Sequence, residues 1–303
     1  MTRTPGLRLA ALALALIGAC SAAPVTPSAP APTPMIAAPP SASSPASVAP
    51  SVGSSPLVDR PTGTTDVVLQ MHRRGGFLWP GTTVDLPPTF TLYGDGTVIY
   101  GDADALAGND PRRGLRVARM DEEQIAALIA FALGPGGLAE AAAVYDDVPV
   151  ADATSIGFTV NATGTPKTVS VYALDDGLDE PGPETAHRQR FLQLFELLNS
   201  FADQVARGNA SDAGPYEPMA YQATLFRDEF DELQVTGEWP WDDLEPADFE
   251  RDQSGFSVGV ITPAQAEALA RVAAGDMGDP AVIGPDDATY LIRLRPLLAD
   301  EIE

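Results

Sequence analysis

Side chains that could act as nucleophiles or as acid–base groups are few in this sequence, and they are far apart. The 303 residues include one cysteine, Cys20, one lysine, Lys167, and two histidines, His72 and His187. Neither histidine belongs to a zinc-ligand or nucleophile-elbow motif, so both are expected to be surface or capping residues. Lys167 begins an expected strand, where a solvated lysine is the ordinary case. We therefore predict no catalytic residue and no cofactor.

Acidic side chains are abundant, and loops rich in them could supply the oxygen ligands that Ca²⁺ needs. Adjacent aspartates fall in loop-like sequence at 146–147, 175–176, 242–243 and 286–287. The best candidate metal site combines Asp175, Asp176, Asp179 and Glu180, although their spacing does not match an EF-hand loop. The alternative is that these carboxylates are solvated in turns or cap helices. A hydrolase with paired carboxylates is a further hypothesis, but the sequence does not give the separation in space that such a mechanism needs.

The three tryptophans all neighbour a proline. Trp79 precedes Pro80, and Trp239 and Trp241 flank Pro240 in an acidic stretch. Indoles held rigidly in this way could stack on sugar rings or fill a pocket of a partner protein. The alternative is that they fill the space between a sheet and a helix in a small core. The three tryptophans are the candidate binding residues.

The first twenty residues differ from the rest of the chain. Arg3 and Arg8 precede an apolar stretch at 9–17, which suits a signal peptide and is shorter than the roughly 20 residues of a membrane span. The stretch ends in Ile17-Gly18-Ala19-Cys20, which resembles the lipobox of bacterial lipoproteins. An exported protein with one thiol cannot form an internal disulfide, and lipidation would account for that thiol. The alternative is ordinary secretory cleavage nearby, with an incidental cysteine.

The lipobox resemblance implies a location and a partner. A diacylglyceryl group on the Cys20 thiol, with cleavage just before that residue, would hold the protein at the outer face of the cell membrane or make it a periplasmic outer-membrane lipoprotein. Between residues 21 and 60, 28 of the 40 positions are Pro, Ala or Ser, which predicts a disordered, extended tether. Without Arg3 and Arg8 the chain has 16 basic and 42 acidic side chains, a net charge of −26. This charge repels phosphate backbones, so we expect no nucleic-acid partner.

Beyond the tether, hydrophobic periodicity predicts hairpins mixed with single helices, which indicates an α+β fold. Hairpins are expected at 89–100 and 155–174, and further strands at 67–71, 220–226, 256–261 and 289–294. Helices are expected from a capping box at Asp121 to Gly134, over 186–207, and from a second capping box at Thr262 to Gly275. The stretch 208–215 is expected to be a domain boundary or a long loop.

These elements predict four segments: a signal peptide at 1–19, the lipidated cysteine and tether at 20–63, an α+β domain at 64–207, and a second domain or subdomain at 216–303. Residues 115–137 align without gaps with 256–278, which suggests either a duplicated strand–helix unit or convergence on the same capping rules. Residues 66–203 also resemble uncharacterised secreted domains that have a Gly-Asp-Gly hairpin before a capped helix. That resemblance implies no activity.

Together these features favour a cell-envelope lipoprotein that displays a domain outside the membrane. The expected role is non-catalytic binding of an envelope protein or a cell-wall glycan. The alternative is a secreted hydrolase that uses acidic residues, with or without Ca²⁺.

Overall fold

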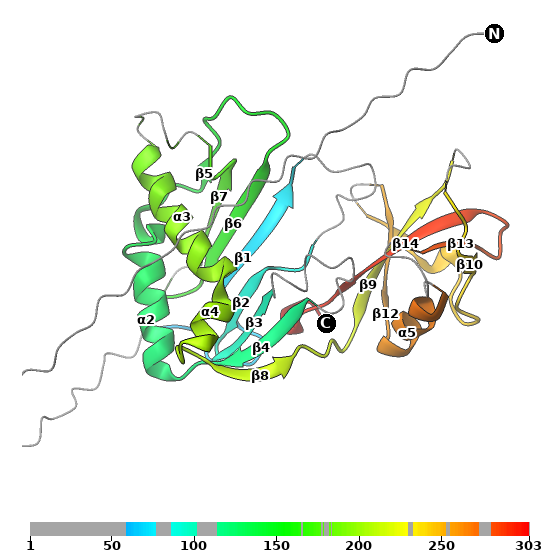
Figure 1. Ribbon diagram of the computed structural model, residues 1–303, viewed down its shortest axis with the longest axis horizontal. Coiled ribbons are helices and arrows are strands. Elements are labelled where there is room, and N and C mark those ends of the chain that lie inside the picture. Colours follow the sequence, from blue (N-terminus) through cyan, green and yellow to red (C-terminus); the bar gives the residue numbers. More distant parts are fainter. Residues whose placement is uncertain are drawn as a thin grey trace, which may run out of the picture. The chain divides into compact units, whose positions relative to one another are not determined.

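The computed structural model describes residues 59–76, 86–101, 114–164, 166–176, 178, 182, 184–229, 233–252, 255–272 and 280–302. Cys20, Trp79, Asp179 and Glu180 lie outside the described residues, as do the predicted signal peptide and most of the predicted tether. Residues 53–303 form one compact unit, in which two β-sheets are accompanied by helices (Figure 1). The predicted α+β fold is confirmed.

The first sheet has eight strands in the order β5-β7-β6-β1-β2-β3-β4-β8. All neighbours are antiparallel except β5 and β7. Both predicted hairpins form, β2 with β3 and β6 with β7. Gly96 closes the first of them at a φ of +84°, a left-handed conformation that favours glycine. The strands are β1 Val67–Gly75, β2 Phe90–Tyr93, β3 Thr97–Gly101, β4 Leu115–Arg119, β5 Val144–Tyr145, β6 Thr154–Val160, β7 Lys167–Tyr172 and β8 Ser211–Pro215.

Three helices lie on one face of this sheet: α2 Glu122–Leu133, α3 Thr185–Asn199 and α4 Phe201–Ala206 (Figure 1). Their apolar residues recur at the spacing of one helix face, and that face is buried. The buried positions are Ile125, Leu128, Ile129 and Ala132 on α2, and Phe191, Leu194, Leu198 and Phe201 on α3 and α4. The predicted apolar stripes are therefore the core-facing sides of these helices.

The prediction of one continuous helix over 186–207 is wrong at Ser200. There the backbone leaves helical geometry, with φ −105° and ψ 37°, and the chain divides into α3 and α4. The ring of Phe201 lies 4.9 Å from that of Phe90 and 5.3 Å from that of Tyr100. Phe201 is thus buried against the sheet directly after the break, and at the break itself the Ser200 hydroxyl donates to the carbonyl of Glu196, a contact that often bends helices.

The second sheet has six strands in the order β10-β13-β14-β9-β12-β11, and only β10 and β13 pair in parallel. The strands are β9 Tyr221–Arg227, β10 Gly237–Glu238, β11 Glu250–Arg251, β12 Ser257–Ile261, β13 Ala281–Ile283 and β14 Thr289–Pro296. The helix α5, Pro263–Val272, follows β12. Its predicted capping box is present, since the backbone N–H of Gln265 donates to Thr262 Oγ1 and that of Thr262 donates to Gln265 Oε1. Short 3₁₀ turns lie at Leu138–Glu140, Pro246–Asp248 and Ala299–Glu301.

Residues 208–215 are not wholly a loop, because β8 extends the first sheet alongside β4. The change of sheet falls between Pro215 and Tyr221, and the proposed division into two domains stays a prediction. The two aligned segments form matching local units, β4 followed by α2 and β12 followed by α5. Their neighbours differ, since β4 lies between β3 and β8 whereas β12 lies between β9 and β11. Both duplication and convergence remain compatible with this arrangement.

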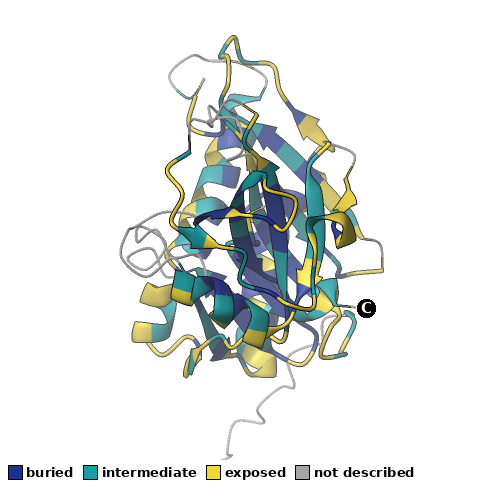
Figure 2. Ribbon diagram, turned by 90° about the vertical axis from the view of Figure 1, so that its right-hand side faces the viewer, coloured by how far each residue is buried: buried dark blue, intermediate teal, exposed yellow. Residues whose placement is uncertain are grey.

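Buried apolar residues form three clusters. Figure 2 shows in dark blue that many residues along the strands are buried. The largest joins the first sheet to α2, α3 and α4. The second joins the second sheet to α5. The third contains Leu298, from the C-terminal segment, together with Tyr93, Ile99 and Leu115 of the first sheet. The C-terminal segment therefore packs on the first sheet after leaving β14 of the second.

Candidate functional site

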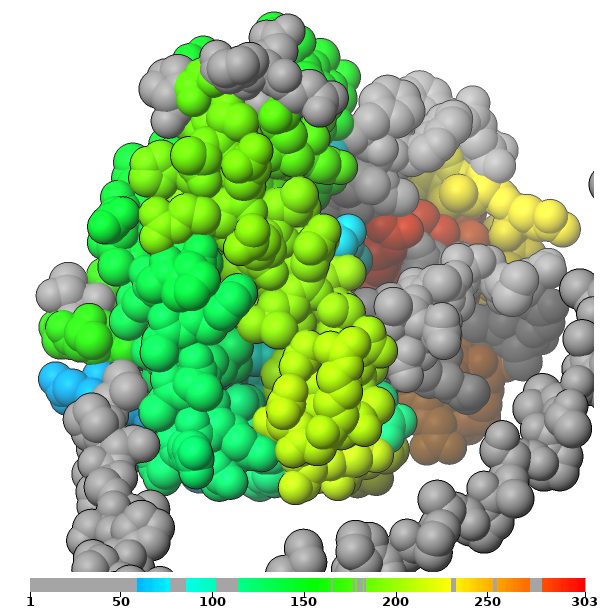
Figure 3. Space-filling model, turned by 60° about the vertical axis from the view of Figure 1, so that its left-hand side comes forward, coloured from blue at the N-terminus to red at the C-terminus, as the bar shows by residue number. Residues whose placement is uncertain are grey.

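A cleft of about 540 Å³ lies between α2 and the α3–α4 pair. Figure 3 shows the face of the molecule on which these helices lie side by side. The volume falls within the range of small-molecule sites, roughly 300–1,000 Å³. The lining comes from two segments far apart in sequence, namely Met120, Asp121, Glu123, Gln124, Ala127, Leu128 and Phe131 on one side, and Leu197, Phe201, Gln204 and Asn209 on the other.

The first wall of the cleft is fixed by the capping box of α2. Asp121 Oδ1 accepts the backbone N–H of Gln124 at 2.9 Å, and Gln124 Oε1 accepts that of Asp121 at 2.9 Å. Gln124 Nε2 also donates to the carbonyl of Gly208 at 3.3 Å, which links the two walls. Arg190 holds the far end of α2, where its guanidinium donates to the carbonyls of Gly134 and Pro135. The helix is thus held at both ends.

The second wall depends on the break at Ser200. Phe201 is buried on the sheet, and Leu197 and Gln204 line the cleft on either side of it. Gln204 Oε1 accepts a hydrogen bond from Asn209 Nδ2 at 2.8 Å. This bond leaves Gln204 Nε2 and Asn209 Oδ1 available at the edge of the cleft. The wall therefore combines an apolar floor with an amide rim.

The rim is rich in acceptors. Glu123 is exposed and makes no hydrogen bond or ion pair within the described part of the chain. Its neighbour Glu122, which does not line the cleft, pairs with Arg60 at 2.7 Å. The lining residues include two carboxylates, Asp121 and Glu123, and no lysine or arginine. The cleft therefore offers a negative edge above an apolar floor.

The tryptophan candidates belong to the core of the second sheet. Trp241 is 5% exposed and donates from Nε1 to the carbonyl of Gln265 at 2.9 Å. Trp239 is half-buried, donates to the carbonyl of Leu244, and lies 5.0 Å from the Trp241 ring in an edge-to-face arrangement. Phe249 and Tyr290 complete this aromatic cluster. The structure thus supports the packing alternative at Trp241, while Trp79 lies outside the described residues.

The acidic pairs do not converge. All eight aspartates of the four pairs are exposed, including the two candidate metal ligands Asp175 and Asp176. Within the described ranges, no three His, Cys, Asp or Glu side chains come together as a metal site would require. Some of the aspartates have local roles. Asp286 Oδ2, for example, accepts the Tyr290 hydroxyl at 2.9 Å.

The two histidines are separate from each other and from the cleft lining. His72 on β1 lies over Gly157 of β6, where an added Cβ would meet its ring at 2.2 Å. His187 packs against Tyr145 and Phe191 in the first turn of α3. Lys167 donates to the carbonyl of Ala139 at 3.0 Å. Each of these residues has a place in packing or in local hydrogen bonding.

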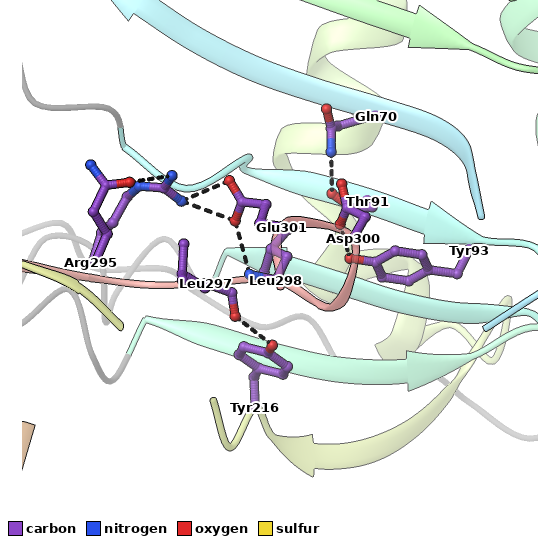
Figure 4. Close-up of polar contacts among 10 residues, drawn as sticks. Gln70, Thr91, Tyr93, Tyr216, Arg295, Leu297, Leu298, Asp300 and Glu301 are labelled. Atoms are coloured by element: carbon purple, nitrogen blue, oxygen red, sulfur yellow. Dashed lines mark hydrogen bonds and ion pairs between the residues drawn. The ribbon is translucent and has the colours of Figure 1, made fainter. Parts of the chain in front are cut away.

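A polar network that the sequence did not suggest lies where the C-terminal segment meets the first sheet (Figure 4). The Tyr93 hydroxyl donates to Asp300 Oδ1 at 2.5 Å, and the Tyr216 hydroxyl donates to the carbonyl of Leu297 at 2.8 Å. The guanidinium of Arg295 donates to both carboxylate oxygens of Glu301, at 2.8 and 2.9 Å. Its second terminal nitrogen donates to Gln222 Oε1 at 2.8 Å. The network fixes the 3₁₀ turn at the end of the chain.

The two tyrosines of this network have raised pKa values. Burial, followed by the hydrogen bond to Asp300 and the charge of that carboxylate, raises the pKa of Tyr93. Burial and the negative charges of Glu301 and Asp300 raise the pKa of Tyr216 to about 12. Both hydroxyls are therefore protonated donors at neutral pH. They act as hydrogen-bond donors that hold the C-terminal turn, not as bases.

Comparison of the chain with protein-family models, with curated proteins and with solved structures found no match. None of the described helices is long and apolar enough to cross a membrane.

Part of the cleft is predictable from the sequence alone. The sequence predicts the capping box at Asp121, and Leu197 and Gln204 fall within the helix expected at 186–207. The sequence does not predict the break at Ser200, after which α4 contributes Phe201 and Gln204 to the cleft. For the Tyr93–Asp300 contact no signal was available, since 207 residues separate the two partners.

Proposed function

We propose that this chain is a cell-envelope lipoprotein, anchored through diacylglyceryl on Cys20, whose globular part binds a ligand in the cleft between α2 and α4. The lipobox-like Ile17-Gly18-Ala19-Cys20 and the Pro-, Ala- and Ser-rich residues after it support the anchor. The observation that carries the binding role is the cleft itself, whose volume is about 540 Å³ and whose apolar floor has a polar rim. Binding, and no chemical step, is the role that we assign to it.

A glycan ligand loses its main support, because Trp241 is buried and Trp239 contacts other rings of the same core. An acidic-residue hydrolase has no specific observation in its favour, since the aspartate pairs lie in separate exposed segments. The cleft instead suits a ligand with a substantial apolar part, because Leu128, Phe131 and Leu197 contribute to its lining.

Filling the cleft tests this proposal. Ala127 on α2 lines the cleft and is exposed, so Ala127→Trp should place an indole in it without disturbing the core. The full chain carrying Cys20→Ala, which keeps lipid out of the assay, would be titrated with the neutral apolar dye Nile red. We expect a fluorescence increase on binding, and loss of most of that increase in the Ala127→Trp variant.

The matched control is Ala130→Trp, because Ala130 is exposed on the same helix and does not line the cleft. This variant adds the same indole outside the cleft, so it should leave dye binding unchanged. Equal dye binding by the two variants would show that the cleft is not the binding site.

A further inference from the structure

We propose that the α2–α4 cleft selects ligands that join an apolar body to a positively charged group, the simplest being an amphipathic amine. This inference rests on the binding role proposed above and adds the chemical class of the ligand. Three observations carry it: the apolar floor, the unneutralised carboxylates of the rim, and the imbalance between acceptors and donors around the opening.

The apolar floor of the cleft indicates that the ligand has an apolar part. Met120, Leu128, Phe131, Leu197 and Phe201 all contribute to the lining. Met120, Phe131 and Leu197 are partly buried, so they retain surface that a ligand could cover. Each square ångström of apolar surface removed from water contributes about 25 cal/mol, which makes an alkyl or aryl group the natural occupant.

The carboxylates of the rim indicate that the ligand also has a positively charged group. Asp121 caps α2 through Oδ1, so its Oδ2 accepts no hydrogen bond from any described residue. Neither carboxylate oxygen of Glu123 accepts a hydrogen bond from a described residue. The nearby arginines are engaged elsewhere. Arg60 binds Glu122 and backbone carbonyls, and Arg207 pairs with Asp203 at 3.9 Å. The carboxylates that line the cleft therefore lack a protein counter-ion among the described residues.

The hydrogen-bonding groups at the edge of the cleft also favour a positively charged group in the ligand. Acceptors at the edge are Asp121 Oδ2, the Glu123 carboxylate and Asn209 Oδ1, whereas the main free side-chain donor is Gln204 Nε2. An ammonium group has three donors and no acceptor, which matches this excess of acceptors. An anionic headgroup would meet two carboxylates and few donors.

The N-terminus of α2 would by itself favour an anion, since helix N-termini present free N–H groups and a positive partial charge. Here that site is already occupied. Asp121 caps the Gln124 N–H, and Glu122 and Glu123 stand in the first turn. The net charge of the chain, −24, adds a long-range preference for cations.

Three ligands with the same eight-carbon chain and different headgroups test the inference: octylamine, octan-1-ol and octanoate. The Cys20→Ala full chain would be titrated with each by calorimetry. We expect octylamine to bind most tightly and octanoate least. Glu123→Gln should reduce the preference for octylamine over octan-1-ol by about two- to fivefold, the range expected for one exposed ion pair.

The control is Glu122→Gln, which removes the same charge from the same turn of α2 at a residue that does not line the cleft. It should leave the preference for octylamine close to that of the parent chain. If Glu122→Gln and Glu123→Gln reduce it equally, the effect is one of general charge and the assigned rim is wrong.

Failure of the inference and failure of the binding role are distinguishable. Equal affinity for octylamine and octan-1-ol, with binding of both lost in Ala127→Trp, would contradict the proposal that the ligand is cationic. The same result would still support the cleft as the binding site. Tightest binding of octanoate would also overturn the class. Binding of all three ligands that persists unchanged in Ala127→Trp would overturn the proposed function itself.

Discussion

At the scale of single residues, the hydrogen bonds of two tyrosines show how the C-terminal turn is held. Tyr93 and Tyr216 are separated by more than 100 residues, yet both donate to the segment 297–300. Arg295 holds Glu301 with two hydrogen bonds, and the charge-assisted kind is about twice as strong as a neutral one. These side chains hold the chain end in one conformation.

The raised tyrosine pKa values predict a loss of stability at alkaline pH. A tyrosine in the unfolded chain titrates near pH 10, whereas the pKa of Tyr216 in the folded protein is about 12. Its contribution to the free energy of unfolding is therefore complete below about pH 10 and is lost as the pH rises through about 12. Urea unfolding between pH 8 and 12 should show this fall, and Tyr216→Phe should make it shallower. An identical pH dependence in both proteins would contradict the assignment.

The roles of Trp239 and Trp241 could not be predicted from the sequence. Trp239 and Trp241 stand beside a proline in an acidic segment, a pattern equally typical of a binding patch and of a core. Tyr290, Phe249 and the carbonyl of Gln265 decide between them, and these partners become neighbours only when β12, α5 and β14 assemble. Local sequence does not contain that information.

At the scale of elements, local rules predicted helix starts and hairpins well. Asp121 with Gln124 and Thr262 with Gln265 form capping boxes as expected, because both partners lie within four residues. Local rules do not predict the short strand β8 or the end of α3. Ser211–Pro215 has no apolar alternation and joins the sheet only through β4. The residue after the break, Phe201, packs against the rings of Phe90 and Tyr100, which are distant in sequence.

The capping boxes support a paired prediction. Asp121→Ala and Thr262→Ala should each lower the free energy of unfolding by about 1 kcal/mol, the usual cost of losing an N-cap. Only Asp121→Ala should also weaken ligand binding in the cleft, because α2 lines it and α5 does not. Thermal unfolding and dye titration measure the two effects.

Asp121→Asn is the control for the cap, since asparagine is an equally good N-cap residue and lacks the charge. It should restore most of the stability. If Asp121→Ala and Asp121→Asn unfold alike, the carboxylate acts at this position through its charge and the capping interpretation is wrong.

At the scale of the whole molecule, the C-terminal segment joins the core of the first sheet to the end of the second. Leu298 is fully buried with Tyr93, Ile99 and Leu115, directly after β14. Leu298→Ala should therefore destabilise the protein by about 2–5 kcal/mol, the range for a buried leucine that leaves a cavity. The matched control is Leu86→Ala, at a leucine that is 53% exposed, which should change stability by about 0.5 kcal/mol or less. Urea unfolding compares them, and equal losses would contradict the joining role of the segment.

Lipid on Cys20, as proposed, would hold the whole molecule at a membrane. Cells producing the full chain would be labelled with a radioactive or alkyne-bearing palmitate and then fractionated. We expect label on the chain and recovery of the chain with membranes. Both should be lost in Cys20→Ala and kept in the neighbouring Ser21→Ala control. An unlabelled chain, or a Cys20→Ala variant that stays with the membranes, would contradict the proposed anchor.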